Sequence, residues 1–215
     1  MSALDSKVIV ALGREYGSGG HQIALLLAEK LGIPLYDKEM ISLAGSQSGL
    51  SSPLLDLVDE HVMHVYIQAS TAAAAALDTE SPHLQTMSLN DQLHAAQVDL
   101  LTNLARQGSC IIVGRTADYV LRDDPDLISV FVRANLEARV QRIAQISSIP
   151  DDEALEQIQT MDAQRAAYYE RYTSRHWGDL SHYDLTISST VLGIDSTADQ
   201  LEDFVRRVAR RRAHL

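Results

Sequence analysis

The sequence predicts an α/β fold, in which helices cover a parallel sheet on both faces. Short apolar runs rich in β-branched residues alternate with helical patterns, and the first run passes directly into a glycine-rich turn. With 215 residues, the chain can bury one core of ordinary size. An apolar content of 46% and a net charge of -11 exclude a disordered chain. We therefore expect a single domain over residues 1–215.

The amino-terminal residues predict a strand, a turn, a helix and a second strand. Apolar residues at 7–12 predict a buried strand, because they end at a glycine-rich stretch. Leucine and isoleucine recur at helical spacing over 21–31, and Gly32 supplies the stop. Residues 33–36 predict a second short strand, and Asp37 is the expected N-cap of a helix that follows it.

Helical patterns dominate the segment 53–107. It includes an alanine run at 72–76, which has high helix propensity and favours a packed or dimerising helix. A homodimer is therefore one expectation for the chain. Proline, serine and threonine at 78–88 predict a break, and apolar periodicity resumes over 89–106.

The carboxyl-terminal half continues the alternation of strands and helices. Strands are expected at 110–113, 128–132 and 184–188, and helices after Asn135, over 151–175 and after Ser196 or Thr197. Strands that are separated by helices pair in parallel, which gives the expected sheet.

Composition excludes several classes of protein. The apolar runs are too short to span a membrane, and we expect neither a signal peptide nor a membrane partner. A single cysteine, Cys110, excludes an intramolecular disulfide and a multi-cysteine metal site, which favours the reducing cytoplasm. With 18 basic against 29 acidic residues, general nucleic-acid binding is not expected. The basic run at 206–212 is better explained by the preference of helix ends for cations.

The glycine-rich turn after the first strand is the first functional signal. Gly17, Gly19 and Gly20 allow consecutive backbone N–H groups to converge on an anion, and the helix that follows adds its partial positive charge. A turn that merely connects two elements is the alternative. The strand–turn–helix context favours phosphate binding.

This turn departs from the usual phosphate-loop pattern G-x-x-x-x-G-K-[ST]. With Gly19 as the second glycine, Arg14 stands at the first glycine, Gly20 at the lysine and His21 at the hydroxyl residue. Ser18 is the nearest hydroxyl group. His21 either touches phosphate or is an ordinary polar residue of a first helical turn.

A set of arginines is the second functional signal. One arginine directly follows a predicted strand, and the others share helix faces with one another or with tyrosines. They are Arg115, Arg139, Arg142, Arg165 and Arg175, the last two with Tyr168 and Tyr172. Solvated helix faces paired with the excess carboxylates are the alternative. Together with a phosphate loop, the set favours phosphoryl chemistry, because guanidinium groups match phosphoryl oxygens.

Several short motifs carry a family resemblance. They are GREYGSGG at 13–20, PLYDK at 34–38, VGRTAD at 113–118, EARVQR at 137–142, RAAYY at 165–169, WGD at 177–179 and YDL at 183–185. Together they resemble the cytidylate-kinase-like family of P-loop proteins, which is similar to the nucleoside monophosphate kinases. The resemblance implies a three-layer P-loop NTPase fold with a helical acceptor-binding insertion at about 37–107 and an arginine-bearing lid at about 147–180.

The resemblance also implies an activity and assigns roles. The activity is transfer of phosphate from ATP, with Mg²⁺, to a nucleoside monophosphate, CMP or dCMP. Gly17, Ser18, Gly19, Gly20, His21 and Gln22 would hold the ATP phosphates, and Arg115 the acceptor's phosphate, with Asp37 near the acceptor or the metal. Arg139, Arg165 and Arg175 would be the catalytic arginines of the lid. Arg14 is expected to supply the charge of the missing lysine.

Two other functions stay open at this point. The chain could phosphorylate another small metabolite on the same fold, or it could be a nucleotide-binding regulatory protein with weak or lost catalysis. The missing lysine favours the regulatory protein, because binding alone needs no transition-state charge. The retained arginines favour a kinase. Trp177 is expected to anchor the end of the lid, with stacking on a base as the alternative.

Overall fold

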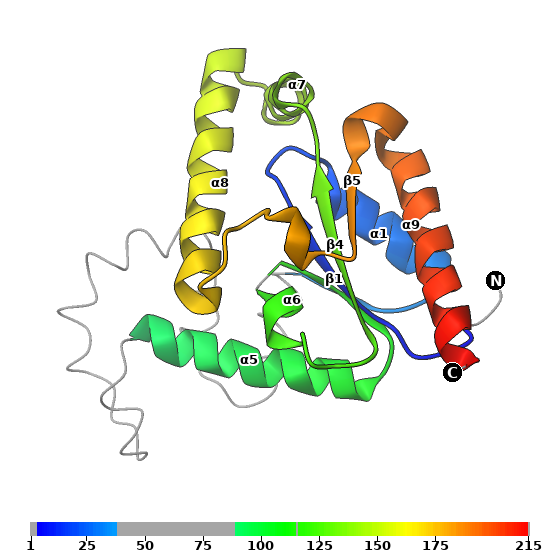
Figure 1. Cartoon of the computed structure of the whole chain (residues 1–215). Helices are drawn as coiled ribbons and strands as arrows, with labels where there is room; N and C mark the ends of the chain where they lie inside the picture. The colour runs from blue at the N-terminus through cyan, green and yellow to red at the C-terminus, as the bar shows by residue number, and fades with distance from the viewer. Residues whose placement is uncertain (1–3, 38–88, 115, 215) are drawn as a thin grey trace.

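The protein is described by a computed structural model that covers residues 4–37, 89–114 and 116–214 (Figure 1). The helix expected after Asp37, the alanine run at 72–76 and the break at 78–88 lie outside the described residues. Arg115 lies outside them as well.

The described residues confirm the predicted α/β fold. The strands are β1 (Ile9–Arg14), β2 (Leu35–Tyr36), β3 (Cys110–Val113), β4 (Leu127–Arg133) and β5 (Leu185–Ser188). The helices are α1 (Gly20–Leu31), α5 (Leu89–Gln107), α6 (Ala117–Val120), α7 (Leu136–Ser147), α8 (Asp151–Thr173), the 3₁₀ turn η1 (Leu180–His182) and α9 (Ser189–Ala213).

The five strands form one parallel sheet in the order β2-β3-β1-β4-β5. The strand that leads into the glycine-rich turn is therefore central. Leu12 of β1 is in register with Val113 of β3, and Gly13 with Phe131 of β4. Since all strands run the same way, the residues that follow β1 and β3 meet at one edge of the sheet, where open α/β folds bind ligands.

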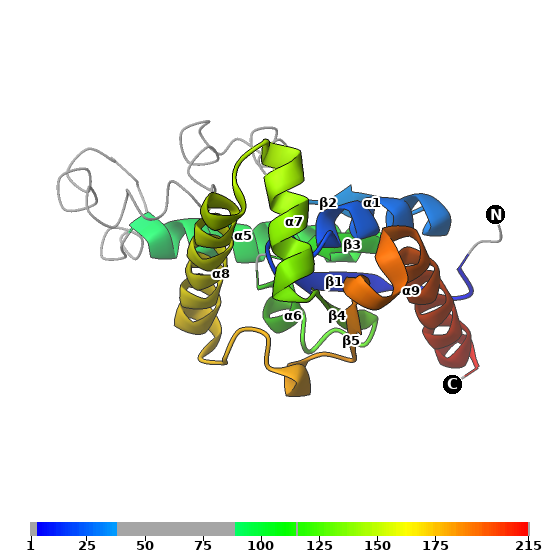
Figure 2. The same ribbon diagram turned by 90° about the horizontal axis from the view of Figure 1, so that it is seen from above.

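Two apolar clusters, one on each face of the sheet, explain why β1 is apolar at each position from Ile9 to Leu12. Val10 and Leu12 pack with α1 and α9 on one face, and Ile9 and Ala11 pack with α5 and α6 on the other (Figures 1 and 2). Successive side chains of a strand point to opposite faces, so a strand covered on both sides must be apolar throughout. The fold thus has three layers, helix, sheet and helix.

Helices α7 and α8 lie beyond the carboxyl-terminal edge of the sheet (Figure 1). Ile143 of α7 and Ala154 and Ile158 of α8 form a third, smaller apolar cluster, against which Tyr16 of the glycine-rich turn packs. These two helices therefore stand directly over the turn.

The end of the chain differs from the prediction. Helix α9 begins at Ser189 rather than at Ser196 or Thr197, and it is interrupted at Gly193, whose φ of 74° and ψ of 176° are not helical. The sequence periodicity revealed only the part after this interruption. In the described part of the chain, no helix is both long and apolar enough to cross a membrane.

Candidate functional site

The glycine-rich turn joins β1 to α1 through two residues in the left-handed region. Gly17 and Gly19 have φ values of 77° and 80°, which favour glycine. A Cβ at Gly17 would also lie only 3.1 Å from the Arg139 carbonyl oxygen on α7. The turn therefore needs glycine both for its backbone conformation and for its close packing against α7.

The backbone amides at the start of α1 are arranged to receive an anion. His21 and Gln22 belong to the first helical turn, where the helix itself supplies no carbonyl partners for the N–H groups. Ser18 is fully buried, donates its hydroxyl to the Glu15 carbonyl at 2.8 Å and accepts from the Gly20 amide at 3.3 Å. Its hydroxyl thus stabilises the turn.

A pocket with a cavity volume of about 350 Å³, here called the loop pocket, lies over this turn. It is lined by Arg14, Glu15, Tyr16, Gly17, Gly19, Gly20, His21, Gln22, Arg142, Ile143, Ile146 and Arg165. All the predicted phosphate-binding residues line it except Ser18, which lies beneath its surface. The carboxylate of Asp37 comes to its rim, with Oδ2 3.7 Å from Nδ1 of His21.

Arg142 belongs to the predicted arginine set, but no role in the site was assigned to it. Its Nη1 donates to the Gly17 carbonyl at 2.5 Å, and its Cζ lies 3.5 Å from where a Cβ at Gly19 would be. Burial lowers the pKa of this guanidinium, although an arginine stays charged at neutral pH. Its sequence signals were its position three residues after Arg139 and its place in the motif EARVQR at 137–142.

Arg139 lies behind the turn and lines neither this pocket nor the second one described below. It is buried, donates Nε to the Tyr16 carbonyl at 2.7 Å and pairs with the carboxylates of Asp162 and Glu15. Contact between Arg139 and a transferred group therefore stays a prediction.

Arg14 fills the space that a side chain at position 20 would need. A Cβ built on Gly20 would lie 2.6 Å from Cβ and 3.0 Å from Cγ of Arg14, and a Cβ on Gly114 would collide with Nη1 of Arg14. The arginine side chain thus runs from the start of α1 to the end of β3. A lysine at position 20 and this placement of Arg14 exclude each other sterically.

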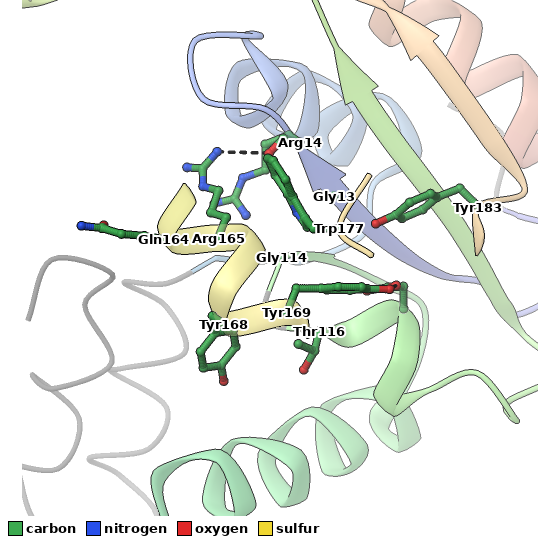
Figure 3. A pocket seen from close by; sticks show the side chains of 11 residues that line it. Gly13, Arg14, Gly114, Thr116, Gln164, Arg165, Tyr168, Tyr169, Trp177 and Tyr183 are labelled. Atoms are coloured by element: carbon green, nitrogen blue, oxygen red, sulfur yellow. Dashed lines mark hydrogen bonds between the residues drawn. The ribbon is translucent and has the colours of Figure 1, made fainter. Parts of the chain in front are cut away.

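A second pocket, here called the aromatic pocket, is drawn in Figure 3 and has a cavity volume of about 60 Å³. It is lined by Gly13, Arg14, Gly114, Thr116, Asp118, Gln164, Arg165, Tyr168, Tyr169, Trp177 and Tyr183. The loop pocket has the volume of a small-molecule site, whereas the aromatic pocket is much narrower in this structure. Arg115 lies outside the described residues, but its two neighbours in the chain line this pocket.

One wall of the aromatic pocket is a buried hydrogen-bond network. The Tyr169 hydroxyl donates to Oδ2 of Asp118 at 2.6 Å. Burial raises the pKa of the Asp118 carboxyl, and burial beside Asp118 raises the pKa of Tyr169 well above its usual value. Predicted Arg175 is close to this network but does not line the pocket, since its Cζ lies over the Tyr119 ring, 5.0 Å from the centroid.

Arg14 and Arg165 are the two residues that line both pockets. Nη1 of Arg165 donates to the Arg14 carbonyl at 3.1 Å, and Figure 3 shows the two side chains lying together. The predicted catalytic residue Arg165 therefore lies beside the glycine-rich turn. Two cations stand where the loop pocket meets the aromatic pocket.

Magnesium was expected with the nucleotide. In the described ranges, no group of three or more His, Cys, Asp or Glu side chains could hold a metal ion. Mg²⁺ commonly takes only one or two carboxylates and completes its shell with substrate phosphates and water. Asp37 at the rim of the loop pocket fits that requirement, whereas the Ser18 hydroxyl is already engaged in the turn.

Comparison with known proteins agrees with this geometry. A cytidylate kinase from Methanocaldococcus jannaschii is 29% identical over 109 residues, which cover 49% of this chain and 58% of that protein. The match thus spans little more than half of the relative's length. A cytidylate kinase from Pyrobaculum calidifontis is 22% identical over 92% of both chains.

Solved structures share the fold. An uncharacterized protein from Eubacterium ventriosum superposes with a TM-score of 0.69 at 25% identity, over 93% of this chain and 98% of that one. Shikimate kinase from Bacteroides thetaiotaomicron superposes with a TM-score of 0.53 at 13% identity, over 93% and 99% of the two chains, and shows the fold alone. Residues 9–191 match the cytidylate kinase-like family. Since that match extends over most of the chain, the protein belongs to the cytidylate kinase-like family and has the P-loop kinase fold.

Proposed function

We propose that the protein transfers the γ-phosphoryl group of ATP to a nucleoside monophosphate, CMP or dCMP, with Mg²⁺. The observation that carries this proposal is the pair of pockets that share Arg14 and Arg165. A kinase must hold a donor and an acceptor on either side of the group in transit and neutralise the charge between them. Two adjoining pockets with two arginines at their junction have that layout.

The loop pocket is the proposed donor site. The amides of the first turn of α1 and the guanidinium of Arg142 face its hollow, and both suit the β- and γ-phosphates of a nucleotide. Arg14 lies where the loop lacks its lysine, so its charge would serve the same phosphates. Asp37 would hold Mg²⁺, which would neutralise part of the charge of the phosphates when bound.

The aromatic pocket is the proposed acceptor site. Trp177, Tyr168 and Tyr183 offer flat apolar faces, which suit a planar base better than a polyol. Gly114 and Thr116, the neighbours of Arg115 in the chain, line the same pocket, which supports the proposal that Arg115 holds the acceptor's phosphate. The single buried cysteine fits the cytoplasmic location that forms part of this proposal.

In the proposed reaction, an oxygen of the acceptor's phosphate forms a bond to the γ-phosphorus as the bond to the leaving ADP oxygen breaks. Charge then spreads over the oxygens of the transferred group, and Arg14 and Arg165 stand where it develops. Arg175, which lies behind Asp118 and Tyr119, is proposed to keep that wall of the acceptor site in place.

A coupled assay for ADP release tests this proposal. Purified protein is supplied with ATP, Mg²⁺ and, in turn, CMP, dCMP, UMP, AMP, GMP and shikimate. We expect turnover with CMP or dCMP, and a large loss of turnover in Arg165→Met. Arg207→Gln is the matched control, because it removes an exposed arginine that pairs with Asp203 on α9, and it should keep full activity.

The glycine at the lysine position favours a second candidate function. A nucleotide-binding regulatory protein needs to recognise phosphates but not to stabilise a transition state. Tight binding of ATP without turnover of any acceptor would support that function over the kinase. Turnover with an acceptor that is not a nucleotide would support a kinase of another small metabolite.

A further inference from the structure

The backbone of Tyr16, in the glycine-rich turn that we propose to bind phosphate, is held by a charged pair, Arg139 of α7 and Asp162 of α8. The Tyr16 amide donates to Oδ1 of Asp162 at 2.8 Å, and the Tyr16 carbonyl accepts from Nε of Arg139 at 2.7 Å. The other oxygen of Asp162 accepts from Nη2 of Arg139. Both polar groups of one loop residue are therefore fixed by two side chains that also bind each other.

This pair is shielded from water. The Arg139 side chain is 8% exposed and that of Asp162 is 20% exposed. Glu15 adds a second carboxylate, with Oε1 3.7 Å from Arg139, and its Oε2 accepts from the Ala134 amide at 2.8 Å. Hydrogen bonds between charged groups in such a setting are short and geometrically demanding, so they hold a backbone in one position.

Helix α8 connects the pair of Arg139 and Asp162, here called the clamp, to the aromatic pocket. Arg165 follows Asp162 by three residues, so both lie on the same side of the helix, and Arg165 lines both pockets. Tyr168 and Tyr169, on the next turn, line the aromatic pocket but not the loop pocket. A shift of α8 relative to the Tyr16 peptide would therefore change the donor site and the acceptor site together.

We propose that Asp162, together with Arg139, is a positioning residue that couples the two pockets, so that a nucleotide on the phosphate loop raises the affinity of the acceptor site. This inference rests on the proposed function. Neither side chain lines the loop pocket or the aromatic pocket, so their effect reaches the ligands through the loop backbone and α8. Coupling between two sites is reciprocal, and a factor of about 5 to 150 is usual.

Trp177 provides a readout that does not depend on turnover. It is the only tryptophan of the chain and it lines the aromatic pocket, so its fluorescence reports acceptor binding. CMP is titrated with and without a saturating non-hydrolysable ATP analogue and Mg²⁺, and the ratio of the two dissociation constants is the coupling factor. Binding of the analogue alone is measured by calorimetry.

Two variants of Asp162 remove the clamp in different ways. Asp162→Asn keeps an acceptor for the Tyr16 amide but removes the charge that faces Arg139. Asp162→Glu keeps that charge but shifts the carboxylate by one methylene, so the variant stays informative if Asp162→Asn unfolds. Glu202→Gln is the control, because it breaks a 2.8 Å pair with Arg206 of similar exposure on α9, away from both pockets.

We expect the wild type and Glu202→Gln to bind CMP at least about fivefold more tightly with the analogue present. Both Asp162 variants should lose most of this factor while they still bind the analogue and melt cooperatively. Coupling that persists in both variants, or that is absent from a wild type that binds both ligands, would overturn the inference and leave the proposed function standing. A wild type that binds neither ligand would overturn both.

Discussion

Restoring the lysine of the usual phosphate loop should damage this protein rather than improve it. In Gly20→Lys, the new Cβ would lie 2.6 Å from Cβ of Arg14. Because carbon atoms in contact are about 3.5–4.0 Å apart, the end of β1 and the start of α1 would have to separate by about 1 Å. A misplacement of that size in a catalytic site costs roughly 10²-fold in rate. Arg14 itself stands at the junction of the two pockets and would be displaced as well.

Replacing Arg14 complements the measurement on Gly20→Lys. Arg14→Met should lower kcat by about 10²–10³-fold, or roughly 3–4 kcal/mol of transition-state stabilisation, since Arg165 remains as the second cation at the junction. The double variant Arg14→Gly/Gly20→Lys removes the clash and returns an ammonium, so it should recover part of the activity that Gly20→Lys loses.

The assay is steady-state phosphoryl transfer from ATP to CMP, with thermal melting to show that each variant folds. Gly20→Lys with activity equal to or above the wild type would refute the reasoning, because the arginine and the lysine would then coexist. Unchanged kcat in Arg14→Met would show that Arg14 does not replace the lysine.

Three further substitutions or reactions probe the site and its surroundings. Gly114→Ala places a Cβ against Nη1 of Arg14 at a φ of 74°, so kcat should fall and the free energy of unfolding should drop by about 1–2 kcal/mol in chemical denaturation. Burial raises the pKa of Asp118, so the contribution of this carboxyl to stability is lost as the pH rises above about 4 and the buried group must ionise. Asp118→Asn keeps an acceptor for the Tyr169 hydroxyl but has no carboxyl to ionise. The Tm of this variant minus that of the wild type should therefore increase with pH. A difference that stays constant with pH would contradict the raised pKa of Asp118. Burial raises the pKa of Cys110 to about 11, so iodoacetamide at pH 8 should modify the folded protein far more slowly than the unfolded protein, and equal rates would contradict the buried thiol.

The sheet could be predicted from sequence because its pattern is local. A parallel strand covered on both faces must be mostly apolar, and residues 8–12, 110–113 and, apart from Ser129, 128–132 meet that condition. The glycines of the turn were equally informative, since Gly17 and Gly19 have positive φ values.

The roles of the arginines on α7 could not be predicted in the same way. Helical periodicity places Arg139 and Arg142 close together but does not say which one faces the loop pocket. The structure decides through a tertiary contact, because Asp162 of α8 draws Arg139 behind the turn and leaves Arg142 beside Gly17. The path of Arg14 over Gly20 likewise depends on the register between β1 and β3.

The tyrosines of α8 show that helical periodicity alone does not predict which side chains line a pocket. Tyr168 and Tyr172 were predicted to share one helix face, and they do, since their ring centroids are 4.9 Å apart. The Tyr172 ring, however, stacks on His94 of α5 with the ring centroids 3.8 Å apart and does not line the aromatic pocket. Tyr169, which lies off the predicted face, lines the aromatic pocket beside Tyr168. The aromatic pocket therefore contacts more of α8 than the single face that holds Tyr168. The contact of Tyr172 with α5 could not be predicted, because local periodicity does not show which helix packs beside α8.

The central claim is that donor and acceptor bind on either side of Arg14 and Arg165. It is tested most directly with a bisubstrate compound that joins adenosine and cytidine through five phosphates, titrated into the protein by calorimetry with Mg²⁺. We expect it to bind more tightly than either ATP or CMP, and to lose that advantage in Arg14→Met and in Arg165→Met. A compound that binds no more tightly than ATP alone, with its cytidine leaving Trp177 fluorescence unchanged, would contradict the claim.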